Sequence, residues 1–105
     1  MLIRSAFWIG KPQSGQVQAF RQLIVDELVP AMRDFPGVSN ARSLWPEHFE
    51  DDPPQIHCQV IVEFADAAAK AAMMASAQRS ALRPRVVAAI DLFDGQLSHI
   101  DYIVL

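Results

Sequence analysis

The sequence predicts an α+β domain whose elements follow the order β-α-β-β-α-β. Three observations predict it. The segment 55–64 alternates between two sets of residues with a period of two, one set fully apolar, which is typical of a strand with one buried face. The segment 17–35 carries apolar residues three or four positions apart, which indicates an amphipathic helix. The segment 65–77 is rich in alanine and directly follows the clearest strand, so we expect a second helix there.

The first half of the chain predicts a strand, a helix and a second strand. Residues 2–9 are rich in branched and aromatic side chains and end at a glycine, so we expect them to form the first strand. The helix follows Ser14, a residue suited to an N-cap. Pro30 lies inside this helix and should interrupt and kink it, because its ring displaces a backbone carbonyl. Residues 38–45 form the second strand, and the acidic, proline-bounded stretch 46–54 is expected to be a loop.

The second half predicts a strand, a helix interrupted by proline and a final strand. The alanine-rich helix begins after Asp66, whose side chain suits an N-cap. Pro84 is expected to break the helix, because it suits the first turn of a new helix better than the interior of an old one. Residues 97–105 form the last strand. This order is the ferredoxin-like arrangement, a four-stranded antiparallel sheet with both helices on one face, and we expect a single domain over residues 1–105.

Length, composition and charge exclude several classes of protein. A chain of 105 residues suits one domain, and a hydrophobic share of 51% excludes a disordered chain. No apolar run reaches the roughly 18 residues of a membrane helix, and the start of the chain lacks the features of a secretory signal. We therefore expect a cytoplasmic protein without a membrane partner. A net charge of −3 argues against a nucleic-acid partner, and a single cysteine cannot form an internal disulfide.

Strand alternation predicts which side chains point away from the helices. In segment 55–64 the fully apolar set should face the helices, which leaves the intervening, mostly polar set outward. In the first and last strands we assign Ile3, Phe7 and Ile9, and Ile100, Tyr102 and Val104, to the helix side. The predicted outward face then mixes apolar with ionisable side chains: Leu2, Arg4, Ala6, Trp8, His57, Gln59, Ile61, Glu63, Leu97, His99, Asp101, Ile103 and Leu105.

Such a face is too apolar to remain in water, so we expect a second copy of the chain to cover it and form a homodimeric α+β barrel. Two sheets packed face to face would enclose the polar side chains in a partly apolar cavity, which is typical of small-molecule sites. The predicted ligand-binding residues are Trp8, Arg4, His57, Glu63, His99 and Asp101.

His57 and His99 are the candidate catalytic residues. Either could act as a general base if Glu63 or Asp101 orients the ring. The alternative is a pair of hydrogen-bonded or interface histidines without a catalytic role.

Other residues carry weaker chemical signals. Arg4 and Arg42 could hold an anionic or carbonyl-bearing ligand, or they could form ion pairs between subunits. Tyr102 and Cys58 are assigned to the core by strand parity, where a thiol is unreactive. The loop 46–54 contains metal-ligand residue types without the spacing of a known site, so we predict no metal. No phosphate-binding loop or known catalytic motif is present, and we expect no resident cofactor.

Several short segments resemble the EthD-like family of dimeric α+β barrel proteins. They are Phe35-Pro36-Gly37-Val38 with Pro30 upstream, Val62-Glu63-Phe64-Ala65-Asp66-Ala67, and Phe93-Asp94-Gly95. The resemblance covers nearly the full length. It implies a homodimer with a shared central barrel and a ligand cavity between sheet and helices. Its relatives include cofactor-free monooxygenases, isomerases and proteins with no assigned reaction.

The chain departs from the family pattern on the first helix. Members often carry a tryptophan and a histidine there, and the corresponding positions hold Ile24 and Leu28. No catalytic residue therefore transfers. The resemblance implies a small-molecule-binding protein, with a cofactor-free enzyme (monooxygenase, isomerase or related) acting on a small apolar oxygenated metabolite in catabolism as the first hypothesis. The alternative is a non-catalytic dimerisation or ligand-sensing module, which the missing histidine favours.

Overall fold

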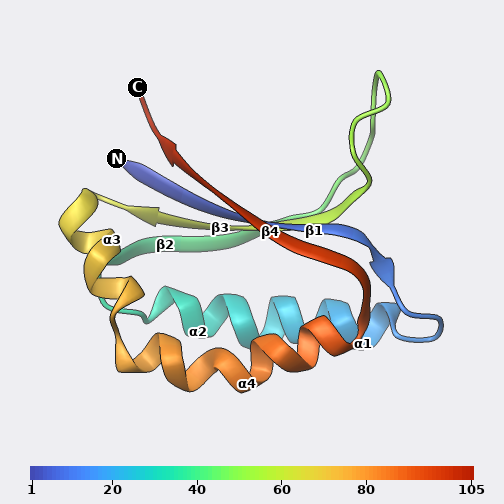
Figure 1. Cartoon of the computed structure of the whole chain (residues 1–105), viewed down its shortest axis with the longest axis horizontal. Coiled ribbons are helices and arrows are strands. Elements are labelled where there is room, and N and C mark those ends of the chain that lie inside the picture. The colour runs from blue at the N-terminus through green and yellow to red at the C-terminus, as the bar shows by residue number, and fades with distance from the viewer.

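The computed structural model describes all residues, 1–105, and places one antiparallel sheet on top of a layer of helices (Figure 1). The elements in chain order are β1 (Leu2–Pro12), α1 (Val17–Gln22), the π-helical segment η1 (Leu23–Leu28), α2 (Val29–Arg33), β2 (Val38–Leu44), β3 (Ile56–Phe64), α3 (Ala67–Met74), α4 (Ala77–Asp91) and β4 (Phe93–Ile103). The strand order across the sheet is β2-β3-β1-β4. The predicted ferredoxin-like fold is confirmed. None of these helices has the length and apolar character needed to cross a membrane.

The hydrophobic core fills the space between the sheet and the helices. Phe20 and Ile24 are fully buried on the helix side, and Phe64 and Cys58 are fully buried on β3. Burying one large apolar side chain stabilises a fold by about 1.5–3 kcal/mol, so the amphipathic pattern of residues 17–35 is what holds the first helix on the sheet. Burial raises the pKa of the Cys58 thiol to about 12, which keeps it protonated and unreactive. The prediction that Cys58 belongs to the core is confirmed.

Pro30 does not end the first helix. The chain continues from α1 through η1 into α2, and the backbone N–H of Val29 donates to the carbonyl of Ile24, five residues earlier. Proline cannot donate a backbone hydrogen bond, and a widened turn just before it allows the helix to continue. The predicted interruption takes the form of this π-helical segment just before Pro30, and the helix continues through it.

The second helix is broken as predicted, but at a different residue. The break falls at Ala75–Ser76 between α3 and α4, where the Ser76 hydroxyl accepts a hydrogen bond from the backbone N–H of Arg79 at 3.1 Å. Pro84 lies inside α4 instead of breaking it. The serine cap is a strong start signal, whereas Pro84 removes only the bond to the carbonyl of Ser80, a residue that is exposed to water.

The register of β1 and β3 fixes which face of the sheet meets the helices. Arg4 lies opposite Val62 and Ala6 lies opposite Val60, and both valines are buried toward the helices. Arg4, Ala6 and the buried Trp8 therefore also face the helices. The predicted assignment for the first strand is wrong, because both alternating sets of β1 are mostly apolar and give no signal for parity.

The assignment of β4 is wrong for the same reason, because β4 pairs with β1. His99 lies opposite Ala6 and Asp101 lies opposite Arg4, so both lie on the helix side of the sheet. Ile100 and Tyr102 lie on the outer face, where 47% and 42% of their surfaces are exposed. Tyr102 is thus not a core residue.

Candidate functional site

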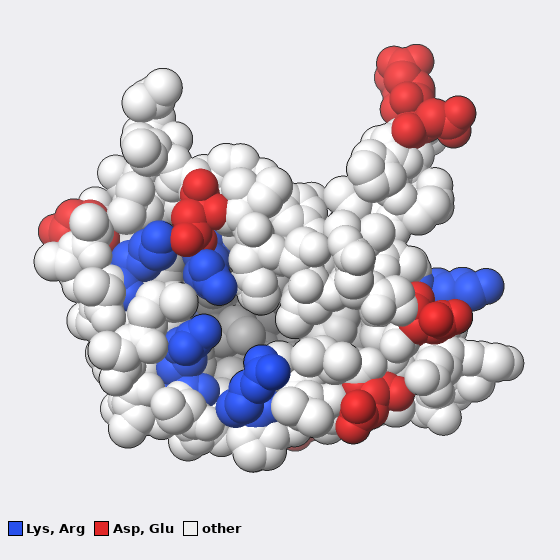
Figure 2. Space-filling view, in the orientation of Figure 1, with Lys and Arg blue, Asp and Glu red and all other residues white.

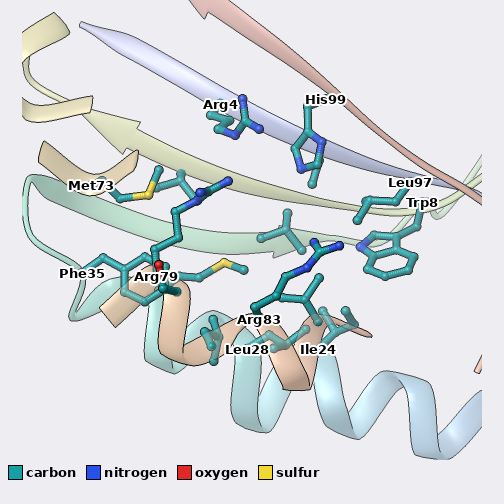
Figure 3. Close-up of a pocket in the computed structure, with 17 residues that line it drawn as sticks. Arg4, Trp8, Ile24, Leu28, Phe35, Met73, Arg79, Arg83, Leu97 and His99 are labelled. Atoms are coloured by element: carbon teal, nitrogen blue, oxygen red, sulfur yellow. The ribbon is translucent and has the colours of Figure 1, made fainter. Parts of the chain in front are cut away.

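A cavity of about 480 Å³ lies between the sheet and the helices (Figure 3). Seventeen residues line it, and 12 of them are hydrophobic. It opens to the surface as a hollow surrounded by basic side chains (Figure 2). A largely apolar cavity of this size, with a few polar groups, is typical of a small-molecule site.

The sheet forms one wall of the cavity. The lining residues from the strands are Arg4, Ala6 and Trp8 of β1, Val60 and Val62 of β3, and Leu97 and His99 of β4. Trp8 is held edge-on against Phe20 and Phe93, with ring centroids 5.1 and 5.3 Å away. These contacts fix the indole, so one end of the cavity is a rigid aromatic surface.

The opposite wall comes from the two helical regions. Ile24 and Leu28 of η1 contribute buried side chains, and Leu82 and Val86 of α4 add apolar surface, together with Met32, Phe35 and Met73. Ile24 and Leu28 are the two positions at which the resemblance to the EthD-like family led us to look for a tryptophan and a histidine. The first helix therefore supplies only apolar surface here, although the π-helical turn that carries these residues is a feature often found at functional sites.

The polar groups of the cavity gather at its mouth. Arg4 and His99 reach in from the sheet, and Arg79 and Arg83 reach toward them from α4 (Figure 3). The Arg4 Nη1 donates to Asp101 Oδ1 at 3.0 Å.

Asp101 is the carboxylate that pairs with Arg4 at the cavity mouth. Lys70 Nζ donates to the second Asp101 oxygen at 2.7 Å. The hydrogen bond from Lys70, together with that from Arg4, holds the pKa of Asp101 below its ordinary value, so this carboxyl stays ionised.

His99 is the titratable group of the cavity. Partial burial lowers its pKa, the positive charges of Arg4 and Arg79 lower it further, and the carboxylate of Asp101 opposes them. A lowered pKa keeps the imidazole neutral at neutral pH. A neutral imidazole at the mouth of an apolar cavity can accept a proton from a bound molecule or donate a hydrogen bond to it.

The structure brings together four of the six predicted ligand-binding residues. Arg4, Trp8 and His99 line the cavity, and Asp101 is bonded to Arg4. They lie on the helix side of the sheet, however, and not on the outward face where we expected them.

His57 and Glu63 lie outside this cavity. The pairing of β1 with β3 shifts between Trp8 and Ile9, and this irregularity places the His57 ring 5.5 Å from Phe20 in the core. Burial lowers the pKa of His57. Glu63 lies on the outer face and accepts from Arg42 Nη2 at 3.0 Å.

Arg79 and Arg83 are the lining residues that the sequence analysis missed. They stand four positions apart, and residues at that spacing share one face of a helix. Leu82 and Val86, which are also four apart, lie on the neighbouring part of the same helix surface and line the cavity too. Had this second helix been predicted to run through Pro84, the shared face would have been visible in the sequence.

The loop between β2 and β3 extends away from the sheet and is acidic at its tip (Figures 1 and 2). Asp51 and Asp52 there have φ values of 59° and 53°, in the left-handed region of backbone conformation. His48 lies 3.5 Å from Glu50. No group of three or more histidine, cysteine, aspartate or glutamate side chains lies close enough together to hold a metal ion.

Comparison with solved structures identifies proteins of the same fold. An EthD family protein from Bacillus halodurans matches with a TM-score of 0.76 and 13% identity, over 100% of both chains. A DABB family protein with a ferredoxin-like fold from Mesorhizobium loti matches with a TM-score of 0.70 and 22% identity, over 99% of this chain and 97% of its own. A proposed antibiotic biosynthesis monooxygenase from Nitrosomonas europaea has a TM-score of 0.66 and 17% identity, over 100% and 99%.

These similarities in structure are not matched at the level of sequence. No protein-family model matches the chain, and no curated protein matches it. The comparisons therefore establish the fold, and function has to be argued from the cavity.

Proposed function

We propose that this protein is an EthD-like small-molecule-binding protein that holds its ligand in the cavity between the sheet and the helices. The observation that carries this proposal is the cavity itself, about 480 Å³ in volume and mostly apolar, with a few polar groups at its mouth. Its shared fold with an EthD family protein supports the proposal. We further infer a single domain in the cytoplasm, with no resident cofactor, and these remain predictions.

The proposal includes a homodimer. The outer face of the sheet carries apolar side chains that no part of this chain covers, among them Ile100 and Tyr102, which are exposed. Exposed apolar patches on a sheet are covered in most soluble proteins, and a second copy related by a two-fold axis is the simplest cover. The resemblance to dimeric barrel proteins favours the same assembly.

Within this proposal, the first hypothesis is an enzyme that works without a tight cofactor on a small apolar oxygenated metabolite. His99 is then the group that moves a proton, because its imidazole is neutral and lies at the cavity mouth. Arg4, held by Asp101, would bind an oxygen atom of the substrate. Trp8 would bind the apolar part of the substrate.

A second candidate function is ligand sensing without catalysis. It is favoured by Ile24 and Leu28, which are buried and supply no proton-transfer group where EthD-like proteins often have one. The cavity and the dimer would then serve only to bind a molecule and report its presence.

Binding and turnover on a panel of phenolic and ether-derived compounds test both hypotheses. Binding is followed by intrinsic tryptophan fluorescence, to which Trp8 and Trp45 both contribute, and turnover by chromatography, for the natural chain and for His99→Ala. His48→Ala, which changes an exposed loop residue far from the cavity wall, is the matched control. The enzyme hypothesis expects His99→Ala to lose turnover by at least about 100-fold while binding persists. Binding without turnover in every variant supports the sensing hypothesis, and no binding of any compound contradicts the proposed function.

A further inference from the structure

The cavity is lined by three arginines and by no aspartate or glutamate, so its mouth carries a local excess of positive charge. The net charge of the protein is −3, yet residues 67–90 contain four basic residues and no aspartate or glutamate. Two of those four, Arg79 and Arg83, line the cavity. Figure 2 shows the basic side chains gathered around the hollow, with acidic side chains mostly elsewhere.

The two arginines from α4 have no acidic partner. Arg79 makes one side-chain hydrogen bond, to the backbone carbonyl of Met74 at 3.4 Å, and Arg83 makes none. Arg85, two positions further on, points elsewhere and lies 3.9 Å from Glu27. Arg79 and Arg83 therefore differ from Arg85 on the same helix, because neither of them has an acidic partner.

The carboxylate nearest to these arginines is already shared. Asp101 accepts from Arg4 and from Lys70, one oxygen for each. The cavity is thus lined by the guanidinium groups of Arg4, Arg79 and Arg83. The one carboxylate beside them, that of Asp101, is already paired with Arg4 and Lys70. Arg79 and Arg83 are exposed to water, which screens their mutual repulsion, and cations left without a counter-charge beside a cavity are expected where a ligand supplies that charge.

We infer that the cavity selects molecules with a carboxylate on an apolar body, and that Arg79 and Arg83 bind this carboxylate across the mouth from Arg4. The inference rests on the proposed function, because it names the chemical class of ligand for the same cavity. A planar guanidinium matches the two oxygens of a carboxylate with paired hydrogen bonds. The apolar lining, with Trp8, Ile24 and Leu28, takes the hydrocarbon part.

A pair of probes separates charge from apolar burial. Decanoate and decanol have the same chain and differ in the charged group, and binding of each is measured by isothermal titration calorimetry. We expect decanoate to bind at least about tenfold more tightly than decanol, and its affinity to fall as salt is added, because charged hydrogen bonds at the mouth contribute about that much. Inorganic phosphate is the third probe, and we expect it to compete only weakly because it lacks an apolar body.

Three substitutions on one helix locate the effect. Arg79→Gln and Arg83→Gln should each weaken decanoate binding about tenfold and leave decanol binding unchanged. Arg85→Gln removes the same charge from the same helix outside the cavity, and it should change neither affinity by more than about twofold. Thermal melts show whether each variant is folded, which is expected because all three arginines are exposed.

His99 provides a second readout that needs no variant. Arg4, Arg79 and Asp101 set its electrostatic environment, and Arg83 lines the same cavity. A bound carboxylate opposes the two arginines, so decanoate should raise the pKa of His99 measured by NMR, whereas decanol should not.

The possible results distinguish failure of the carboxylate inference from failure of the proposed function. Equal affinity for decanoate and decanol, or equal loss in Arg83→Gln and Arg85→Gln, overturns the selection of a carboxylate and leaves the proposed ligand cavity intact. Competition by phosphate as strong as by decanoate overturns the role of the apolar body. Failure of decanoate, decanol and the compound panel alike contradicts the proposed function itself.

Discussion

The outer face of the sheet and the mouth of the cavity differ in how completely their polar groups are paired. On the outer face the polar side chains satisfy one another: the hydroxyl of Ser5, which is 1% exposed, donates to Gln59 at 3.1 Å, and Arg42 pairs with Glu63 at 3.0 Å. At the cavity mouth, Arg4 of the sheet is paired with Asp101, but Arg83 of α4 has no such partner.

This difference suggests which kind of partner each surface binds. An apolar surface whose polar groups are already paired can be covered by another protein surface without leaving a buried group unsatisfied. A cavity that keeps unpaired guanidinium groups at its mouth is suited instead to a small charged molecule. We therefore expect changes on the outer face to affect assembly and changes on the helix side to affect ligand binding, with little overlap.

The largest expected effect comes from a charge on the outer face. Ile100→Asp places a carboxylate on an exposed position of β4, so it should cost the monomer little but leave an unpaired charge in the proposed dimer interface. We expect the dimer dissociation constant to rise at least about 100-fold, measured by analytical ultracentrifugation.

Ile90→Asp is the control for that change. Ile90 lies on α4 and is 37% exposed, so the same substitution there should leave the dimer intact. A natural chain that sediments as a monomer, or an Ile100→Asp variant that remains dimeric, would contradict the proposed assembly.

The next effect comes from filling the cavity. Ala6 is a small side chain in the middle of the sheet wall, opposite His99. Ala6→Leu adds volume where the ligand would lie, and we expect ligand affinity to fall by about tenfold or more, since misplaced volume costs about 1–3 kcal/mol. Sedimentation should be unchanged. An unaltered affinity in calorimetry would place the ligand elsewhere.

The contrast between the faces also explains what the sequence could predict. Residues 58–64 were assigned correctly because one alternating set is fully apolar and the other is mostly polar. In β1 the two sets, Ile3 with Phe7 and Leu2 with Trp8, are nearly equal in hydrophobicity, so only pairing with β3 decides which set is buried. Reversing β1 and β4 together kept their candidate residues side by side, which is why Arg4 and His99 were grouped correctly on the wrong face.

Other features depend on geometry that a pattern of residues does not carry. An irregularity in the pairing of β1 with β3 moves His57 into contact with Phe20, and no glycine or proline within β3 indicates it in the sequence. The break before α4 was misplaced because proline is a stronger signal in a sequence than the Ser76 cap that begins the helix. That error separated Arg79 from Arg83 and hid the charged part of the site.

A smaller effect should appear in the pH dependence of stability. Burial lowers the pKa of His99 in the fold, and Arg4 and Arg79 lower it further, so the unfolded chain binds more protons between that value and about 6.5. The contribution of neutral His99 to the free energy of unfolding is therefore fully present above about pH 6.5. It is lost as the pH falls through the lowered pKa of His99 in the folded state.

His99→Gln should therefore reduce the fall in melting temperature on acidification from pH 7 to pH 5, by less than about 4 °C because the side chain is partly exposed. His48→Gln, in the exposed loop, should leave the pH profile as it is. His57, whose pKa burial also lowers, should account for part of the remaining slope. A profile that His99→Gln leaves unchanged would contradict the electrostatic account of the cavity mouth.

The smallest expected effect is an increase in ligand affinity, and it comes from substituting Asp101. Asp101→Asn removes the carboxylate that pairs with Arg4 and Lys70, and the cavity mouth becomes more positive. Exposed ion pairs contribute at most about 1 kcal/mol, so the fold should tolerate the change. Because Arg4 is then free to bind the ligand, we expect decanoate affinity to rise about two- to fivefold at low salt and the gain to disappear at high salt. Asp94→Asn, a change of the same charge on β4 outside the cavity lining, should produce no gain. Weaker binding in Asp101→Asn would mean that Asp101 acts by positioning Arg4, and the contrast between paired and unpaired charge would then hold for α4 alone.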